Sequence, residues 1–175
     1  MEKSYKEYLN QITTFIFDVD GVFTDGTIQI NENGELLRTM HTKDGFALKT
    51  AVDQGYNVCI ISGGRNEGVR KRFRSLGVTD IHLGAHHKLE PFDEYTDVYN
   101  IPKENVLYMG DDIPDIPVLQ QVGLPTCPQD AVTEVKAVSK YISNKEGGKG
   151  CVRDVVEQVL KVQGKWKTAF DAQYD

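Results

Sequence analysis

Short apolar runs alternate with longer amphipathic segments along most of the chain. The runs are rich in β-branched and aromatic residues, and none shows a strict alternation of apolar and polar positions. Such runs predict strands that are buried on both faces, as in a parallel sheet. We expect these strands at residues 12–17, 56–61, 80–83 and 106–109, with a weaker one around 138–142.

The segments between the runs are typical of helices with one buried face. We expect these helices at residues 45–54, 66–76, 89–100, 116–122 and 152–162. Strands and helices in alternation indicate an α/β fold of the doubly wound, Rossmann-like kind, with a mostly parallel sheet.

Residues 27–41 interrupt this alternation. Two short apolar stretches flank Asn31-Glu32-Asn33-Gly34, and Asn-Gly is a strong signal for a hairpin turn. We therefore expect a short β-hairpin flap after the first strand, too small to be a cap domain. The whole chain is then one domain over residues 1–164, followed by a loosely held tail over 165–175.

The composition agrees with a globular protein and argues against two classes of partner. A chain of 175 residues can build one full hydrophobic core. Its net charge of -6 argues against nucleic-acid binding, and no apolar run approaches the ~20 residues that span a bilayer. Three widely spaced cysteines and a charged N-terminal segment, which is not a signal peptide, favour a cytoplasmic location.

Acidic residues follow the first predicted strand directly. Asp18 and Asp20 lie at its carboxyl end, where open α/β sheets bind their ligands. Two carboxylates at that place are costly unless they are paired or bound to a hard divalent cation. Gly21 permits the sharp turn that lets both acids face one point.

A second acidic group follows the strand at 106–109. It contains Asp111, Asp112 and Asp115. Each acidic group by itself could simply cap the helix that follows it. Two such groups at the ends of parallel strands favour a site for Mg²⁺, which binds carboxylates, waters and a substrate phosphate.

Two further features predict a phosphate site at the same edge. Ser62, Gly63 and Gly64 place a hydroxyl and flexible backbone between a strand and a helix, which suits the binding of an oxyanion by N–H groups. Lys88 follows the strand at 80–83 and adds a cation. A plain turn and a solvated lysine would explain either feature alone, so their weight comes from the combination.

The order of these groups resembles that of the haloacid dehalogenase superfamily of phosphotransferases. The resemblance implies that Asp18 is a nucleophile that forms an aspartyl-phosphate. It implies that Asp20 protonates the leaving alkoxide and later deprotonates water. The implied Mg²⁺ ligands are Asp18, the backbone carbonyl of Asp20 and Asp111, and the implied phosphate-binding residues are Ser62, Gly63 and Lys88.

Within that superfamily, the chain most resembles the capless 3-deoxy-D-manno-octulosonate 8-phosphate (KDO 8-phosphate) phosphatases. Four segments carry this resemblance: DVDGVFTDG, the hairpin that ends in Lys43-Asp44-Gly45, GDDIPDIPV, and GGKGCVRD. It implies hydrolysis of a sugar-acid phosphate by a homotetramer. In such a tetramer the hairpins pack together and neighbouring subunits cover the active sites, with the C-terminal tail as a lid.

The sugar is less closely specified than the chemistry. Many relatives carry a basic residue where this chain has Gly64, and those that act on nonulosonate 9-phosphates tend to carry an acid there. Arg65 offers a cation next to it, while Lys43 and Lys149 stand where arginine is common. These three residues, with Asp112 and Asp115, are candidates for contact with the substrate or for support of the ligands. KDO 8-phosphate is the expected substrate, and a KDN or sialic acid 9-phosphate is the alternative.

Three other interpretations share parts of the pattern. A signalling receiver domain takes phosphate on an acid at its third strand, but here that strand ends in His82-Leu83-Gly84. A non-catalytic module would not be expected to keep the whole set of acids, hydroxyl and lysine. A mutase would normally need a cap to exclude water from the phospho-enzyme. The sequence therefore favours a phosphatase.

Overall fold

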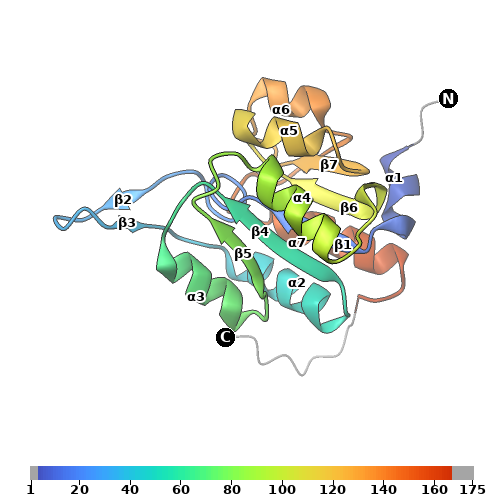
Figure 1. Cartoon of the computed structure of the whole chain (residues 1–175), viewed down its shortest axis with the longest axis horizontal. Coiled ribbons are helices and arrows are strands. Elements are labelled where there is room, and N and C mark those ends of the chain that lie inside the picture. Colours follow the sequence, from blue (N-terminus) through green and yellow to red (C-terminus); the bar gives the residue numbers. More distant parts are fainter. Residues whose placement is uncertain (1–3, 167–175) are drawn as a thin grey trace.

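A parallel six-stranded sheet forms the centre of the computed structural model, which describes residues 4–166 (Figure 1). Its strands, in the spatial order β5-β4-β1-β6-β7-β8, are all parallel to their neighbours. They are β1 (Thr14–Phe17), β4 (Asn57–Ser62), β5 (Asp80–Leu83), β6 (Val106–Met109), β7 (Leu124–Cys127) and β8 (Tyr141–Ile142). From β1 the chain builds one side of the sheet and then the other, so the predicted doubly wound fold is confirmed.

Helices cover both faces of the sheet. One face packs against α1 (Tyr5–Tyr8), α2 (Thr42–Asp53), α3 (Glu67–Ser75) and α7 (Cys151–Val162). The other packs against α4 (Leu89–Val98), α5 (Ile116–Leu119) and α6 (Thr133–Val138). Short 3₁₀ turns lie at Leu9–Gln11, Lys103–Asn105 and Ile113–Asp115. Within residues 4–166, no helix has the length and apolar character needed to cross a bilayer.

The two hydrophobic cores explain why β1 shows no alternation in the sequence. Successive strand residues point to opposite faces. Phe15 and Phe17 are buried in the core beneath α2 and α7, and Ile16 between them is buried in the core beneath α4 and α5. Apolar residues are therefore needed at every position of this strand.

The predicted flap is a two-stranded antiparallel hairpin of β2 (Gln29–Ile30) and β3 (Leu36–Leu37) that projects well away from the sheet (Figure 1). Gly34 adopts a φ of 76° in its turn, and the Asn31 carbonyl accepts a hydrogen bond from the Gly34 N–H. No cap domain accompanies it within the described part of the chain, as expected.

Some element predictions were wrong. β7 was not predicted, because its second residue is Pro125, and a proline inside a strand argues against one. The strand forms nevertheless, because the Pro125 carbonyl still accepts a hydrogen bond from the Lys140 N–H (2.9 Å). The strand predicted around 138–142 is limited to Tyr141–Ile142, and Val138 ends helix α6.

The start of the predicted tail packs onto the domain. The N–H groups of Lys165 and Trp166 both donate to the carbonyl of Leu160. The Trp166 ring lies 6.1 Å from that of Phe46. The rest of the predicted tail, residues 167–175, lies outside the described residues, and so does the lid expected from it.

Candidate active site

Asp18 is fixed at the carboxyl end of β1 by the sheet itself. Its N–H donates to the carbonyl of Met109, which continues the β1–β6 pairing by one residue (3.0 Å). Its Oδ1 accepts from the Val19 N–H (2.7 Å), and the residue is only 6% exposed. The sheet therefore holds one carboxylate rigidly at the floor of a cavity.

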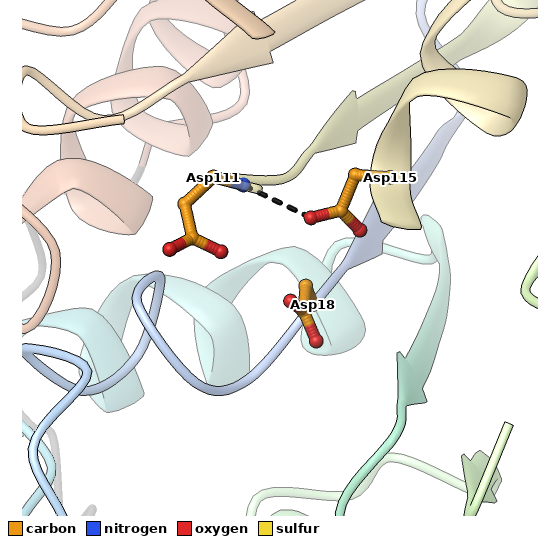
Figure 2. A group of neighbouring side chains, drawn as sticks. All are labelled: Asp18, Asp111 and Asp115. Carbon is orange, nitrogen blue, oxygen red and sulfur yellow. Dashed lines mark hydrogen bonds between the residues drawn. The ribbon is translucent and has the colours of Figure 1, made fainter. Parts of the chain in front are cut away.

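Two further carboxylates face Asp18 from the end of β6 (Figure 2). One carboxylate oxygen from each of Asp18, Asp111 and Asp115 lies within 4.8 Å of the other two. Asp115 is wholly buried, and its Oδ2 accepts from the N–H of Asp111 (3.0 Å) and of Asp112 (3.3 Å). Its Oδ1 accepts from the Tyr108 hydroxyl (2.6 Å). Asp115 therefore shapes the loop that turns Asp111 toward Asp18.

The charges of this cluster are not balanced by protein groups alone. Burial and the charge of Asp115 raise the pKa of Asp18 to about 8 and that of Asp111 to about 7, against the opposing effect of Lys88. A cluster of carboxylate oxygens with excess negative charge is the donor set that suits a hard divalent cation such as Mg²⁺. The residues present therefore fit the expected metal.

Lys88 is the cation of the cluster. Its Nζ lies 2.8 Å from Asp18 Oδ2 and 2.7 Å from Asp115 Oδ1, and the residue is 6% exposed. Burial alone would lower its pKa, but the charges and hydrogen bonds of the two aspartates outweigh burial and raise it. Lys88 is therefore charged while it faces Asp18.

Gly21 lets the two acidic loops meet. Its φ is +83°, and a Cβ at this position would lie 1.9 Å from Asp111 Oδ2. Behind the loop, a Cβ on Gly147 would lie 2.0 Å from the Gly21 carbonyl oxygen, and the Gly148 N–H donates to the carbonyl of Val22 (2.9 Å). The glycines of the GGKG segment thus pack directly against the loop that carries Asp18 and Asp20.

The predicted oxyanion loop faces the same space. Ser62 is 2% exposed at the end of β4, and its Oγ accepts from the Gly64 N–H (3.2 Å). The carbonyls of Ser62 and Gly64 accept from the N–H groups of Ala85 and Gly84 (both 2.9 Å), which ties the loop to the segment before Lys88.

A cavity of about 370 Å³ joins these groups. Its lining includes all the residues predicted for catalysis, metal and phosphate: Asp18, Asp20, Ser62, Gly63, Lys88 and Asp111. Asp112 and Asp115, which were candidates for substrate contact or ligand support, line it as well. Arg65 lines a neighbouring cavity of about 500 Å³. Lys43 and Lys149 line a different cavity, between the end of the flap and α7.

The Lys43-Asp44-Gly45 segment contacts the start of α7. Asp44, the next residue, is wholly buried, and its Oδ1 accepts from the Arg153 N–H at the start of α7 (2.8 Å). A carboxylate at a helix N-terminus satisfies N–H groups that lack partners within the helix. Two of the four segments that carry the family resemblance are therefore joined here, away from the acidic cluster.

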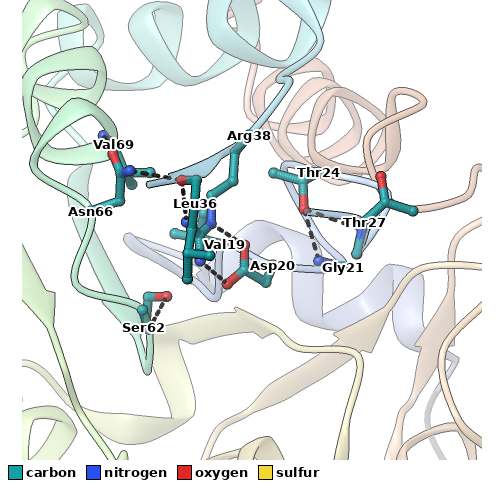
Figure 3. Close-up of polar contacts among 12 residues, drawn as sticks. Val19, Asp20, Gly21, Thr24, Thr27, Leu36, Arg38, Ser62, Asn66 and Val69 are labelled. Carbon is teal, nitrogen blue, oxygen red and sulfur yellow. Dashed lines mark hydrogen bonds and ion pairs between the residues drawn. The ribbon is translucent and has the colours of Figure 1, made fainter. Parts of the chain in front are cut away.

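Sequence reasoning missed Arg38. It leaves the flap and bonds to both oxygens of Asp20, with Nε–Oδ1 at 2.6 Å and Nη2–Oδ2 at 3.0 Å (Figure 3). The sequence around Arg38 does not distinguish it from a solvent-exposed hairpin residue. The one cue is that Arg38 is the first basic residue after Asp18 in a stretch that carries several acids.

Comparisons with known proteins agree with this geometry. Residues 78–153 match the family of haloacid dehalogenase-like hydrolases. The chain is 37% identical over 154 residues to 3-deoxy-D-manno-octulosonate 8-phosphate phosphatase KdsC of Escherichia coli strain K12, which covers 88% of this chain and 82% of the relative.

Solved structures of such phosphatases superpose closely. The one from Yersinia pestis gives a TM-score of 0.90 at 33% identity, with 92% of this chain and 87% of the other covered. The structure from Moraxella catarrhalis, in complex with magnesium, phosphate and KDO, gives a TM-score of 0.88 at 32% identity. The match covers 91% of this chain and 92% of the other. The chain therefore belongs to the haloacid dehalogenase-like hydrolases, in the family of the KDO 8-phosphate phosphatases.

Proposed function

We propose that this protein is a Mg²⁺-dependent phosphomonoesterase that hydrolyses KDO 8-phosphate to KDO and phosphate through an aspartyl-phosphate on Asp18. The supporting observation is the position of that carboxylate. It lies 2.8 Å from a buried lysine and within 4.8 Å of Asp111 and Asp115, at the carboxyl ends of two adjacent parallel strands.

Positioning and charge neutralisation are the main requirements of phosphoryl transfer. Asp18 attacks phosphorus, and the covalent step divides one difficult reaction into two easier ones. Lys88 reduces the repulsion between the anionic nucleophile and the anionic phosphate. The Ser62 hydroxyl and the N–H groups of its loop, which line the same cavity, bind phosphoryl oxygens.

In this proposal Asp20 exchanges protons with the leaving group. Its side chain is 33% exposed, whereas that of Asp18 is 9% exposed, so it lies nearer to the cavity mouth. From there its carboxyl protonates the departing alkoxide and afterwards deprotonates the hydrolytic water.

The Mg²⁺ ligands in this proposal are Asp18, the backbone carbonyl of Asp20 and Asp111. Bound there, the ion would neutralise charge on the phosphoryl oxygens. Asp115 is also close, but its oxygens already accept from Tyr108, Lys88 and two backbone N–H groups. It orients the ligand loop, a supporting role that commonly determines metal affinity.

The relatives support KDO 8-phosphate as the substrate, since the Moraxella catarrhalis structure holds KDO itself. A nonulosonate 9-phosphate is the alternative, because Gly64 lacks the basic side chain that many relatives carry at this position. The proposal includes a cytoplasmic homotetramer. Exposed apolar side chains on the flap, Ile30 at 72% and Leu37 at 47%, support packing between hairpins.

Phosphate release from KDO 8-phosphate and from KDN and sialic acid 9-phosphates tests the proposal, each with Mg²⁺ and with a chelator. We expect kcat/KM to be at least about tenfold higher for KDO 8-phosphate and to depend on Mg²⁺. A preference for the 9-phosphates would overturn the substrate. Asp18→Asn should abolish turnover without unfolding the protein, and a variant with a tenth of the activity would refute the nucleophile.

A further inference from the structure

Arg38 connects the flap to the catalytic loop. The Arg38–Asp20 ion pair uses both carboxylate oxygens and is bidentate, at 2.6 and 3.0 Å. The Arg38 side chain is only 6% exposed, although Leu36 and Leu37 just before it are 39% and 47% exposed. The flap therefore delivers one of its side chains into the protein interior while its neighbours face outward.

The position of Arg38 is fixed from two sides. Its Nη1 donates to the Leu36 carbonyl (3.1 Å), which also accepts from Asn66 Nδ2 (2.9 Å). Asn66 caps helix α3 by accepting from the Val69 N–H (3.1 Å) (Figure 3). The base of the flap is thus pinned to the start of a helix, and Arg38 is held on a rigid support.

Gly64 leaves the space that Arg38 uses. A Cβ on Gly64 would lie 3.0 Å from Arg38 Nη2, which is closer than most real Cβ contacts, and 3.4 Å from Asp20 Oδ2. A side chain at this position would push against the guanidinium. The glycine therefore leaves room for the flap arginine, which places a cation beside Asp20.

A second cavity extends from the nucleophile's cavity along the flap. Its volume is about 500 Å³, and it shares Gly63, Gly64 and His86 with the first cavity. The alcohol portion of a bound phosphate ester would extend into this space. Its lining adds Arg38 and Arg65 and includes no carboxylate from the described residues. A leaving group with negative charge fits such a pocket.

An anionic leaving group in this pocket would compete with Asp20 for the Arg38 guanidinium. Arginine recognises carboxylates through two parallel N–H bonds, and one guanidinium edge cannot serve two carboxylates in this way. In the structure Arg38 gives that edge to Asp20. With both oxygens turned to Arg38, Asp20 is not directed at a leaving-group oxygen.

We propose that Arg38 is a specificity-determining residue, whose guanidinium moves from Asp20 to a carboxylate on the leaving group and thereby releases Asp20 toward the scissile oxygen. The inference rests on the proposed phosphatase function and identifies which feature of the substrate this site detects. Esters without a carboxylate leave the Arg38–Asp20 pair intact and react slowly. The flap then acts in substrate recognition as well as in assembly.

Binding of free KDO, the product acid, tests the exchange without reference to turnover. Calorimetry with the Mg²⁺-loaded protein compares the wild type with Asp20→Asn, Arg38→Ala and the double variant. Releasing Arg38 from its partner should make Asp20→Asn bind KDO about tenfold more tightly, while Arg38→Ala should bind about tenfold more weakly. In the double variant the gain from Asp20→Asn should be lost.

Two controls separate the exchange from simpler effects. The methyl ester of KDO lacks the charge, so its affinity should change by less than about threefold across the set. Arg38→Lys keeps the charge but not the forked guanidinium, so its KDO affinity should lie between those of the wild type and Arg38→Ala. Arg74→Ala removes an exposed arginine that lines neither cavity and should bind KDO as the wild type does.

The outcomes distinguish this inference from the proposed function. If Asp20→Asn strengthens KDO binding equally in the presence and absence of Arg38, the gain comes only from removal of a negative charge. That result would overturn the exchange. An Arg38→Ala variant with wild-type affinity would also overturn it. If KDO binds to no variant, the exchange fails together with the proposed substrate. Binding of KDO without coupling refutes the exchange and leaves the substrate standing.

Discussion

Asp18, Asp111 and Asp115 place three carboxylates in a small buried space, and Lys88 is the cation that bonds to two of them. Burial penalises each charge, and the aspartates also repel one another. Lys88 opposes both effects at Asp18, whose pKa would rise further above about 8 without it. At the scale of single residues, the ionisation of Asp18 thus depends on one lysine.

Lys88→Met should therefore be far more damaging than its modest change in size suggests. We expect kcat to fall by at least about 10³-fold, because loss of Lys88 raises the pKa of Asp18 further and removes a cation that would face the phosphate. Steady-state kinetics, with circular dichroism to show that the variant is folded, checks this. Lys88→Arg keeps the charge in a larger side chain and should retain more activity than Lys88→Met. A kcat within tenfold of the wild type would contradict the role.

Gly21 permits a second test with a matched control. Gly21→Ala and Gly55→Ala introduce the same methyl at the same φ of +83°, but only at Gly21 would the new Cβ meet Asp111, since nothing lies within 4 Å at Gly55. Both should lose about 1 kcal/mol of unfolding free energy from backbone strain.

Beyond that shared cost, Gly21→Ala should unfold at lower denaturant and should bind Mg²⁺ at least about tenfold more weakly, because the Asp111 carboxylate must move. Chemical denaturation and Mg²⁺ titration measure the two effects. Equal stability and equal Mg²⁺ affinity in the two variants would mean that Gly21 matters only for its φ.

At the scale of elements, the sequence was most informative where one physical demand dominates. β1 and β6 are buried on both faces, so their apolar runs were easy to recognise. The flap was predicted from Asn33-Gly34, because few residues adopt that turn. β7 was missed because Pro125 argues against a strand, and only the neighbouring strands show that its missing N–H is tolerated.

The candidate site divides in the same way. Asp18 and Asp111 could be predicted because each lies within two residues of the end of a strand, and parallel strands bring their carboxyl ends to one edge. Arg38 could not, because its bond to Asp20 depends on how the flap folds back over Gly64. Lys43 was a candidate by resemblance, but helix packing places it beside α7, in a different cavity. Long-range packing, which local patterns do not encode, decides such contacts.

The flap also carries a prediction about assembly. Ile30 is 72% exposed near its tip, and a large apolar side chain there suits a contact between subunits. Ile30→Lys should convert the proposed tetramer to smaller species, as measured by light scattering after size exclusion. Val98→Lys, at a site 67% exposed on α4, is the matched control and should leave the assembly unchanged. If Ile30→Lys has the same mass as Val98→Lys and the wild type, the flap does not form the subunit interface.

At the scale of the whole molecule, the acidic cluster links stability, pH and metal. In the folded, metal-free protein the carboxyls of Asp18 and Asp111 keep their protons up to about pH 8 and about pH 7, because burial raises both pKa values from 3.8. In the unfolded chain they ionise near their ordinary values. Over the pH range between, the folded state binds more protons, so the free energy of unfolding must fall as pH rises.

Mg²⁺ should reverse this loss, because it binds the ionised carboxylates and must displace their protons at low pH. We expect the metal to raise Tm by several degrees at about pH 8.5 and by much less at about pH 5.5. Thermal unfolding with Mg²⁺ and with a chelator, at both pH values, measures the difference. Asp111→Asn removes one of the two titrating carboxyls, so its metal-free Tm should fall less with pH and its response to Mg²⁺ should be small. An Mg²⁺ effect of equal size at both pH values would mean that the ion does not bind at this cluster.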